Sequence, residues 1–271
     1  MKLLNIGCGD RFDPEWTNLD IDSHAGGVMA HDARKGLPFP DGSFDAVYHS
    51  HVLEHFDAKN GAGLLRECHR VLRQGGIIRV AVPDLERIAQ LYLTALESVA
   101  NGRTDWQGRY EWMKLEMYDQ AVRESSGGNM PEFVASSSPA VREFVRERMG
   151  GEMARLMPAG NPAERAVRIS VMRRLGRIPK SIARGLFSFA MGHERLAAYS
   201  IGRFRQSGEI HLCMYDRYSL GRALELAGFS APRILAAGES AIPDWARYRL
   251  DIESDGRPYK PDSLHMEAMR E

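Results

Sequence analysis

The chain has 271 residues, enough to bury a full core as one domain with a large insertion or as two domains. Lysine plus arginine and aspartate plus glutamate each number 36, so the overall charge gives no indication of a polyanionic partner. Three widely spaced cysteines argue against a disulfide framework, and no apolar run is long enough to span a bilayer. The start lacks the features of a signal peptide, so we expect a cytoplasmic protein.

The first expected element is an apolar strand over residues 3–6, which leads into a turn at Gly7 and Gly9. Glycine permits unusual backbone angles there and leaves room for a ligand, so we interpret it as a strand-to-helix turn. A second strand over 16–21 places Asp20 where its carboxylate can accept hydrogen bonds from two ribose hydroxyls. A glycine turn followed by an acid on the next strand is typical of an α/β sheet that holds adenosine.

The next elements alternate between strands and helices. A turn at Asp41-Gly42 precedes a strand over 44–49, and apolar spacing over 61–73 predicts a helix that Gly75 and Gly76 terminate. A β-branched strand follows over 77–82, closed by Pro83. This alternation predicts a parallel sheet with right-handed crossovers.

From residue 85 to 207 helical periodicity dominates. Sheet-like order returns with a helix over 217–228 and short strands at 234–235 and 264–266. We therefore expect one α/β domain, formed by residues 1–84 and 208–271, that is interrupted by a helical insertion at 85–207.

Several stretches resemble class I S-adenosylmethionine-dependent methyltransferases, in particular a bacterial branch often associated with polysaccharide biosynthesis. They are LLNIGCGD (3–10), NLDID (18–22), HDARKGLPFPDGSFDAVYHSHVLEHF (31–56), ECHRVLRQGGIIRVAVPD (67–84), MYDRYSLGRALELAGF (214–229) and KPDSLHMEA (260–268). The resemblance implies a Rossmann-like, doubly wound sheet of seven strands with the last strand antiparallel. It also implies S-adenosylmethionine as the cofactor.

On this interpretation the carboxyl ends of the first four strands form the cofactor site. The expected cofactor-binding residues are Asn5, Gly7, Cys8, Gly9, Asp20, Ile21, Asp32, Ala33, His49 and Ser50. Two positions depart from the family pattern, since Asn5 stands where an acid is usual and Asp10 where a third glycine is usual. An NAD dehydrogenase is the nearest rival on the same fold, but it would require that third glycine.

The expected reaction is methyl transfer, with a sugar or glycan hydroxyl as the acceptor. His51 is the first candidate for a general base, because its strand ends beside the reacting end of the ligand, and His211 is the second. His55, Asp84 and Tyr215 are expected to contact the acceptor. A small-molecule natural-product acceptor and a protein that binds the cofactor without catalysis remain as alternatives.

Residues 51–55 also match H-x-x-E-H, a pattern of inverted zinc peptidases. That pattern requires a long helix and a third ligand, whereas here it follows a strand, so we expect no metal site.

Two further features stay open. Aromatic and methionine residues between Trp106 and Tyr118 have the spacing of a helix core, or could line an acceptor pocket. Residues 164–205 contain ten lysines and arginines against two acids, interleaved with apolar residues. They predict either a solvated helix face or a surface attracted to anionic lipid or to a lipid- or nucleotide-linked acceptor; no nucleic-acid partner is expected.

Overall fold

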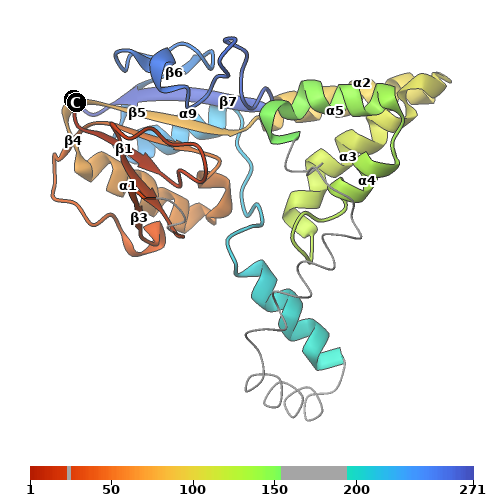
Figure 1. Ribbon diagram of the computed structural model, residues 1–271, viewed down its shortest axis with the longest axis horizontal. Helices are drawn as coiled ribbons and strands as arrows, with labels where there is room; N and C mark the ends of the chain where they lie inside the picture. Colours follow the sequence, from red (N-terminus) through yellow and green to blue (C-terminus); the bar gives the residue numbers. More distant parts are fainter. Residues whose placement is uncertain (23–25, 154–193) are drawn as a thin grey trace.

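The computed structural model describes residues 1–22, 26–153 and 194–271. Its strands form one seven-stranded sheet in the order β3-β2-β1-β4-β5-β7-β6 (Figure 1). The strands are β1 (Leu3–Ile6), β2 (Thr17–Asp20), β3 (Val28–Ala30), β4 (Phe44–Ser50), β5 (Leu72–Pro83), β6 (Ser230–Leu235) and β7 (Ser263–Met269). The last strand, β7, runs antiparallel to both of its neighbours, while β1 to β5 pair in parallel. The expected Rossmann-like sheet is thus confirmed.

The connection from β1 to β2 differs from the expected strand-to-helix turn, because residues 7–16 contain no helix. The amides of Gly7 and Cys8 both donate to the carbonyl of Leu19, so the loop leaves β1 while it is still hydrogen-bonded to β2. Asn18 then holds the loop by donating its side-chain amide to the carbonyls of Asp13 and Trp16. Side-chain hydrogen bonds thus occupy backbone groups that a helix would have used, and Asp10 has no helix N-terminus beside it.

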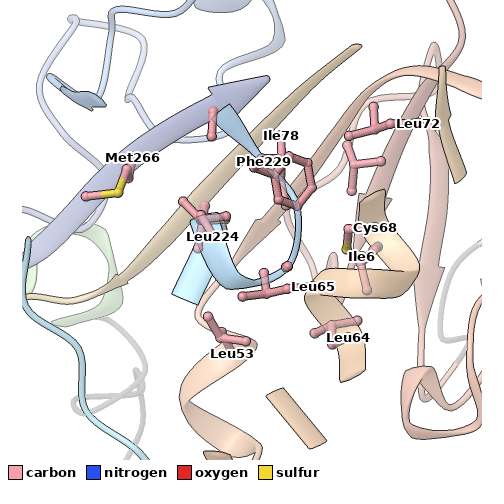
Figure 2. Packing of buried hydrophobic residues seen from close by; sticks show 14 of the residues in the cluster. Ile6, Leu53, Leu64, Leu65, Cys68, Leu72, Ile78, Leu224, Phe229 and Met266 are labelled. Atoms are coloured by element: carbon pink, nitrogen blue, oxygen red, sulfur yellow. The ribbon is translucent and has the colours of Figure 1, made fainter. Parts of the chain in front are cut away.

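One face of the sheet packs against α1 (Ala58–Val71) and α9 (Arg217–Leu226). The buried residues of α1 include Leu64, Leu65, Cys68 and Val71, which are the positions that the helical spacing predicts. Figure 2 shows these side chains meeting Ile6 and Ile78 of the sheet and Leu224 and Phe229 from the α9 region. This face is therefore an ordinary apolar core between helices and sheet.

The end of α1 lies earlier than expected, at Val71, and β5 begins at Leu72. Gly75, with φ of 72°, lies within β5 rather than terminating the helix. Arg270 replaces that glycine stop, because its guanidinium donates to the carbonyls of His69, Arg70 and Leu72. A cation that satisfies the last carbonyls of a helix is a recognised C-terminal cap, and here it comes from the far end of the chain.

The opposite face of the sheet is covered by residues 236–262, the connection between β6 and β7, which include the short α10 (Trp245–Tyr248). Ile242, Trp245 and Leu250 from this connection pack on Leu3 and Tyr48. The guanidinium of Arg79 in β5 lies beneath the connection with no exposed surface. A long irregular segment thus takes the place of covering helices.

Four helices share a second core beyond the end of β5 (Figure 1). They are α2 (Leu85–Ala100), α3 (Gln107–Val122), α4 (Met130–Ser136) and α5 (Pro139–Met149). Trp112 and Met113 are fully buried in this core, as their helical spacing predicts, whereas Tyr118 is exposed. Residues 194–205 are also helical, but most of the basic stretch over 164–205 lies outside the described residues. Within the described ranges, no helix has the length and apolarity needed to cross a membrane.

Candidate active site

Two adjoining cavities open at the carboxyl ends of β1, β2 and β4. The larger has a volume of about 210 Å³ and the smaller about 120 Å³. Gly7 and His51 line both cavities, so these two residues mark the place where the cavities meet. The carboxyl edge of an open α/β sheet is the usual position of a ligand site in this architecture.

Most of the predicted cofactor residues line these cavities. The larger cavity includes Gly7, Asp20, Ile21, Asp32 and Ala33, and the smaller includes Asn5, Gly7, Cys8, Gly9 and Ser50. His49 differs, because its side chain is fully buried and lines neither cavity. Burial lowers the pKa of His49 to about 4, so this imidazole is neutral near neutral pH.

Asp20 is held in place before any ligand arrives. Its Oδ2 accepts a hydrogen bond of 2.8 Å from the amide of Gly9, and its Oδ1 accepts one of 3.2 Å from the amide of Asp22. Gly9 has a φ of 52°, and a Cβ added there would meet nothing within 4 Å, so glycine is required by the backbone angle rather than by crowding. The remaining lone pairs of the Asp20 carboxylate can accept ribose hydroxyls.

Asp32 has a partner that the sequence did not indicate. Its carboxylate accepts from Nε of Arg34 at 2.8 Å and from Nη2 at 3.0 Å, and it also accepts from the Arg34 amide. These contacts with Arg34 hold the pKa of Asp32 below its usual value. Arg34 and His31 line the larger cavity as well, so this end of the site contains more polar groups than expected.

Three residues that sequence reasoning missed line the smaller cavity: Arg11, Tyr259 and Lys260. The guanidinium of Arg11 stacks on the Tyr259 ring, 3.8 Å from its centroid, and Lys260 pairs with Glu152 at 2.7 Å. Arg11 also pairs with Glu253 at 3.5 Å, so each of the two cations that border the cavity has an acidic partner. A ligand carboxylate would share these cations with Glu253 and Glu152. Because Arg11 follows the glycine turn closely in sequence, it could have been predicted to line the site. The position of Lys260, shortly before β7, gave no such indication.

His51 has an unusual backbone for its residue type, with φ of 53° at the end of β4. Strained non-glycine residues of this kind occur mainly where a side chain must be aimed for function. The ring Nδ1 lies 3.2 Å from Oε1 of Glu54, and Nε2 lies 2.8 Å from the hydroxyl of Ser263. Both nitrogens thus have fixed neighbours, and the ring lies at the junction of the cavities.

Glu54 was not singled out for this role by the sequence. It belongs to a short 3₁₀ helix, η2 (Leu53–His55), and its side chain has no exposed surface. Burial raises the pKa of Glu54, but His51, His55 and His211 lower it by more, so the pKa lies well below its usual range. The carboxylate is therefore ionised behind His51.

The remaining predicted residues are divided between the site and the core. His55 lines the larger cavity, whereas His211 is buried beside it, with ring centroids 4.9 Å apart. Burial lowers the pKa of His211 to about 3. Asp84 caps the first turn of α2 by accepting from the Arg87 amide, and Tyr215 is buried among core residues under α1. Neither Asp84 nor Tyr215 lines the two cavities.

A profile for the methyltransferase domain matches residues 12–80, which include β2 to β4, most of β5, and both His51 and Glu54. No curated protein matches the chain. The seven-stranded topology, the Asp20 carboxylate beside the glycine turn and this profile match over part of the chain agree with a Rossmann-like, S-adenosylmethionine-dependent methyltransferase.

Solved structures similar to this chain include three methyltransferases. An S-adenosylmethionine-dependent enzyme from Thermotoga maritima, described as a possible histamine N-methyltransferase, is 13% identical over 100% of this chain and 82% of that one, with a TM-score of 0.41. One from Archaeoglobus fulgidus is 14% identical over 99% and 86%, with a TM-score of 0.40. One from Mesorhizobium loti is 16% identical over 99% and 90%, with a TM-score of 0.37.

The residues present fit the cofactor. Its adenosine part matches the larger cavity, where Asp20 offers carboxylate oxygens and Ile21 and Ala33 offer apolar surface. Its methionine part carries a carboxylate that matches the cations Arg11 and Lys260 of the smaller cavity. Asn5 is less available than expected, because its side-chain amide donates to Asn18 at 3.2 Å.

Proposed function

We propose that this protein transfers the methyl group of S-adenosylmethionine to a hydroxyl oxygen, most specifically one on a sugar or glycan. Bound at the two cavities, the cofactor supplies an activated methyl group. The observation that carries the proposal is the position of the His51 imidazole where the two cavities meet, with the buried Glu54 carboxylate behind it.

The pair can act on a proton. An ionised Glu54 oxygen 3.2 Å from Nδ1 favours the tautomer in which Nδ1 carries the hydrogen, which leaves Nε2 free to accept one. Nε2 now faces the Ser263 hydroxyl at 2.8 Å, so an acceptor hydroxyl would take that place or share it. A hydroxyl must lose a proton during methylation, and a positioned base typically contributes a factor of about 10²–10⁴.

The sugar or glycan part of the proposal is supported by the resemblance to the branch associated with polysaccharide biosynthesis. We extend it to lipid- or nucleotide-linked acceptors, because ten lysines and arginines between residues 164 and 205 suit a phosphate group or an anionic membrane surface. We also propose that residues 1–84 and 208–271 form the cofactor domain and that the inserted residues 85–207 cover the acceptor.

The first test is cofactor binding, measured by calorimetry with S-adenosylmethionine and with its demethylated product. Asp20→Ala should weaken both affinities by at least about tenfold, because it removes the charged carboxylate that accepts hydrogen bonds from the ribose hydroxyls. His69→Gln, a change far from the cavities, is the control and should leave them unaltered. If neither ligand binds the unaltered protein, the proposed function is wrong.

The second test is catalysis with a donor labelled in its methyl group and a panel of free, nucleotide-linked and polyprenyl-linked sugars. His51→Ala should lower turnover by about 10²–10⁴-fold while the cofactor affinity stays within about twofold of the unaltered protein. Unchanged turnover in this variant would eliminate His51 as the base. Binding without transfer to any member of the panel, sugar or small molecule, would favour a non-catalytic role.

A further inference from the structure

The Glu54 carboxylate is buried, and its protein neighbours do not provide all the hydrogen bonds that a buried carboxylate needs. Its side chain has no exposed surface, and neither carboxylate oxygen has a well-aligned hydrogen-bond donor, although Nδ1 of His51 lies 3.2 Å from Oε1. A carboxylate removed from water is costly unless it has hydrogen bonds or a cation as partners. The position of Glu54 therefore suits a cation that binds beside it together with the neighbouring histidines.

Two histidines face the same carboxylate. One donor atom from each of Glu54, His55 and His211 lies within 4.8 Å of the other two, a spacing that a single metal ion can bridge after small side-chain adjustments. The segment that contains His211 is fixed to this place, because the amides of Leu212 and Cys213 both donate to the carbonyl of Glu54. The cluster is thus held together by backbone hydrogen bonds and not by side chains alone.

The protonation pattern of the two imidazoles suits ligation. Nδ1 of His55 lies 3.1 Å from the carbonyl oxygen of Ile210 and must carry the hydrogen to donate there, so Nε2 keeps a free lone pair. A backbone carbonyl that fixes the ring in this way is a common second partner of metal-binding histidines. His211 is 6% exposed, and its Nδ1 is buried without a hydrogen-bond partner.

We propose that Glu54, His55 and His211 bind one divalent transition-metal ion, for which Zn²⁺ is the best chemical match. Two imidazoles and one carboxylate are a frequent ligand set for Zn²⁺ with an open position, and Mn²⁺, Fe²⁺ and Co²⁺ accept the same donors. Mg²⁺ and Ca²⁺ prefer oxygen ligands, so they suit the site less.

The ion has a use in catalysis that rests on the function proposed above. His55 lines the larger cavity together with His51, so an ion bound at His55 would lie near the imidazole to which we assign the proton of the acceptor hydroxyl. The oxygen of that hydroxyl would bind the ion, which lowers its pKa, and the proton would pass to Nε2 of His51. The acceptor class is then a hydroxyl compound, which agrees with a sugar.

Residues 51–55 fit H-x-x-E-H, but the proposed ligand set differs from that pattern, because His51 does not belong to it. Glu54 and His55 are consecutive residues of η2, and His211 supplies the third ligand from beyond residues 85–207. The expectation of no metal site rested on a missing third ligand and on the absence of a long helix, and it did not consider His211.

The test uses the full chain after treatment with a chelator, titrated with Zn²⁺ by calorimetry and analysed for bound metal by mass spectrometry. We expect one ion per chain. His211→Gln and His55→Gln should each weaken Zn²⁺ binding by more than the roughly 10–100-fold that loss of an outer partner costs. Co²⁺ in place of Zn²⁺ should give a visible absorption band that both variants lose.

His69→Gln is the matched control, since it also removes one partly buried imidazole, but His69 lies near the end of α1, packs on Phe229 and lines neither cavity. Circular dichroism establishes that each variant is folded, and at least one of the two histidine variants must be folded for the comparison. If Zn²⁺ does not bind the unaltered chain, or binds all folded variants equally, the metal site is wrong. If the chain binds the cofactor but not Zn²⁺, the metal site is wrong and the proposed function stands. If the chain binds Zn²⁺ but not the cofactor, the proposed function is wrong and the metal site stands.

Discussion

The two faces of the sheet are covered in different ways. On one face, α1 and α9 bury apolar side chains such as Leu65 and Leu224, and the packing follows helical periodicity (Figure 2). On the other, residues 236–262 cover the sheet and surround Arg79, a fully buried cation. The first face depends on apolar burial and the second also on paired charges. One sheet can thus be covered by a regular helical layer, which is stabilised by apolar burial, and by an irregular layer, which also depends on buried ion pairs.

The charged face should show the largest effect of a single change. Arg79 donates from Nε to Asp251 at 2.8 Å and from Nη1 to Glu267 at 3.0 Å, and it also donates to the carbonyls of Ala236, Ala237 and Glu239. Arg79→Met removes the cation that faces two buried carboxylates, so we expect the free energy of unfolding to fall by about 3–5 kcal/mol in urea denaturation.

The control for that prediction is Arg73→Met, which removes an ion pair with Asp45 from a side chain that is 59% exposed. It should cost less than about 1 kcal/mol. If both arginine variants lose the same free energy of unfolding, the buried ion pairs of Arg79 stabilise the protein no more than an exposed pair does.

The apolar face should lose somewhat less. Leu65→Ala removes a side chain that is 1% exposed within the α1 core, and changes of this kind cost about 2–5 kcal/mol through lost burial and the cavity left behind. The same urea measurement applies, and Leu93→Ala at an exposed position of α2 provides a control near zero. A loss clearly larger than that of Arg79→Met would reverse the comparison between the faces.

The smallest effect concerns the rim of the apolar face and depends on pH. Glu67 in α1 accepts from Arg70 and from the amide of Leu37 at 2.8 Å, and these contacts, with Arg70 as the main cause, lower the pKa of Glu67 to about 2. A carboxyl whose pKa is depressed in the folded protein stabilises it fully above its ordinary pKa of 4.5, and this stabilisation is lost as the pH falls toward 2.

Glu67→Gln should therefore destabilise the protein by about 2 kcal/mol at pH 7, and the difference from the unaltered protein should shrink as the pH falls below about 4.5. Unfolding curves at pH 7, 4 and 3 would check this. A difference that stays constant over that range would show that the carboxylate charge is not involved.

Much of the regular framework could be predicted from the sequence. The strands expected over 44–49 and 77–82 lie within β4 and β5, and the apolar positions of α1 agree with expectation, because alternation and helical spacing are local properties. The antiparallel last strand, which the resemblance to class I methyltransferases implied, is present as well. The helix expected after Gly9 is absent, and α1 ends at Val71 rather than at Gly75. In both places side chains from elsewhere, Asn18 and Arg270, satisfy the backbone groups.

The candidate site shows the same division. The residues between Asn5 and Ala33 that we predict to bind the cofactor line the two cavities, and they follow from a turn and strand ends that are close together in the chain. The histidine cluster around Glu54 could not be predicted in the same way, because His211 is far from residues 51–55 in sequence. The partners of Asp32 and Asn5 also escaped prediction, since rotamers and cross-strand neighbours decide them.

The sequence by itself determined the sheet, the glycine turn and the acid that follows it, because these depend on residues that are neighbours in the chain. Only the tertiary structure decided that Glu54 lies buried among His51, His55 and His211, and that Arg79 lies beneath residues 236–262. The physical reason is that buried charges gain their partners from long-range contacts, and the pairing of distant segments leaves no periodic trace in the sequence.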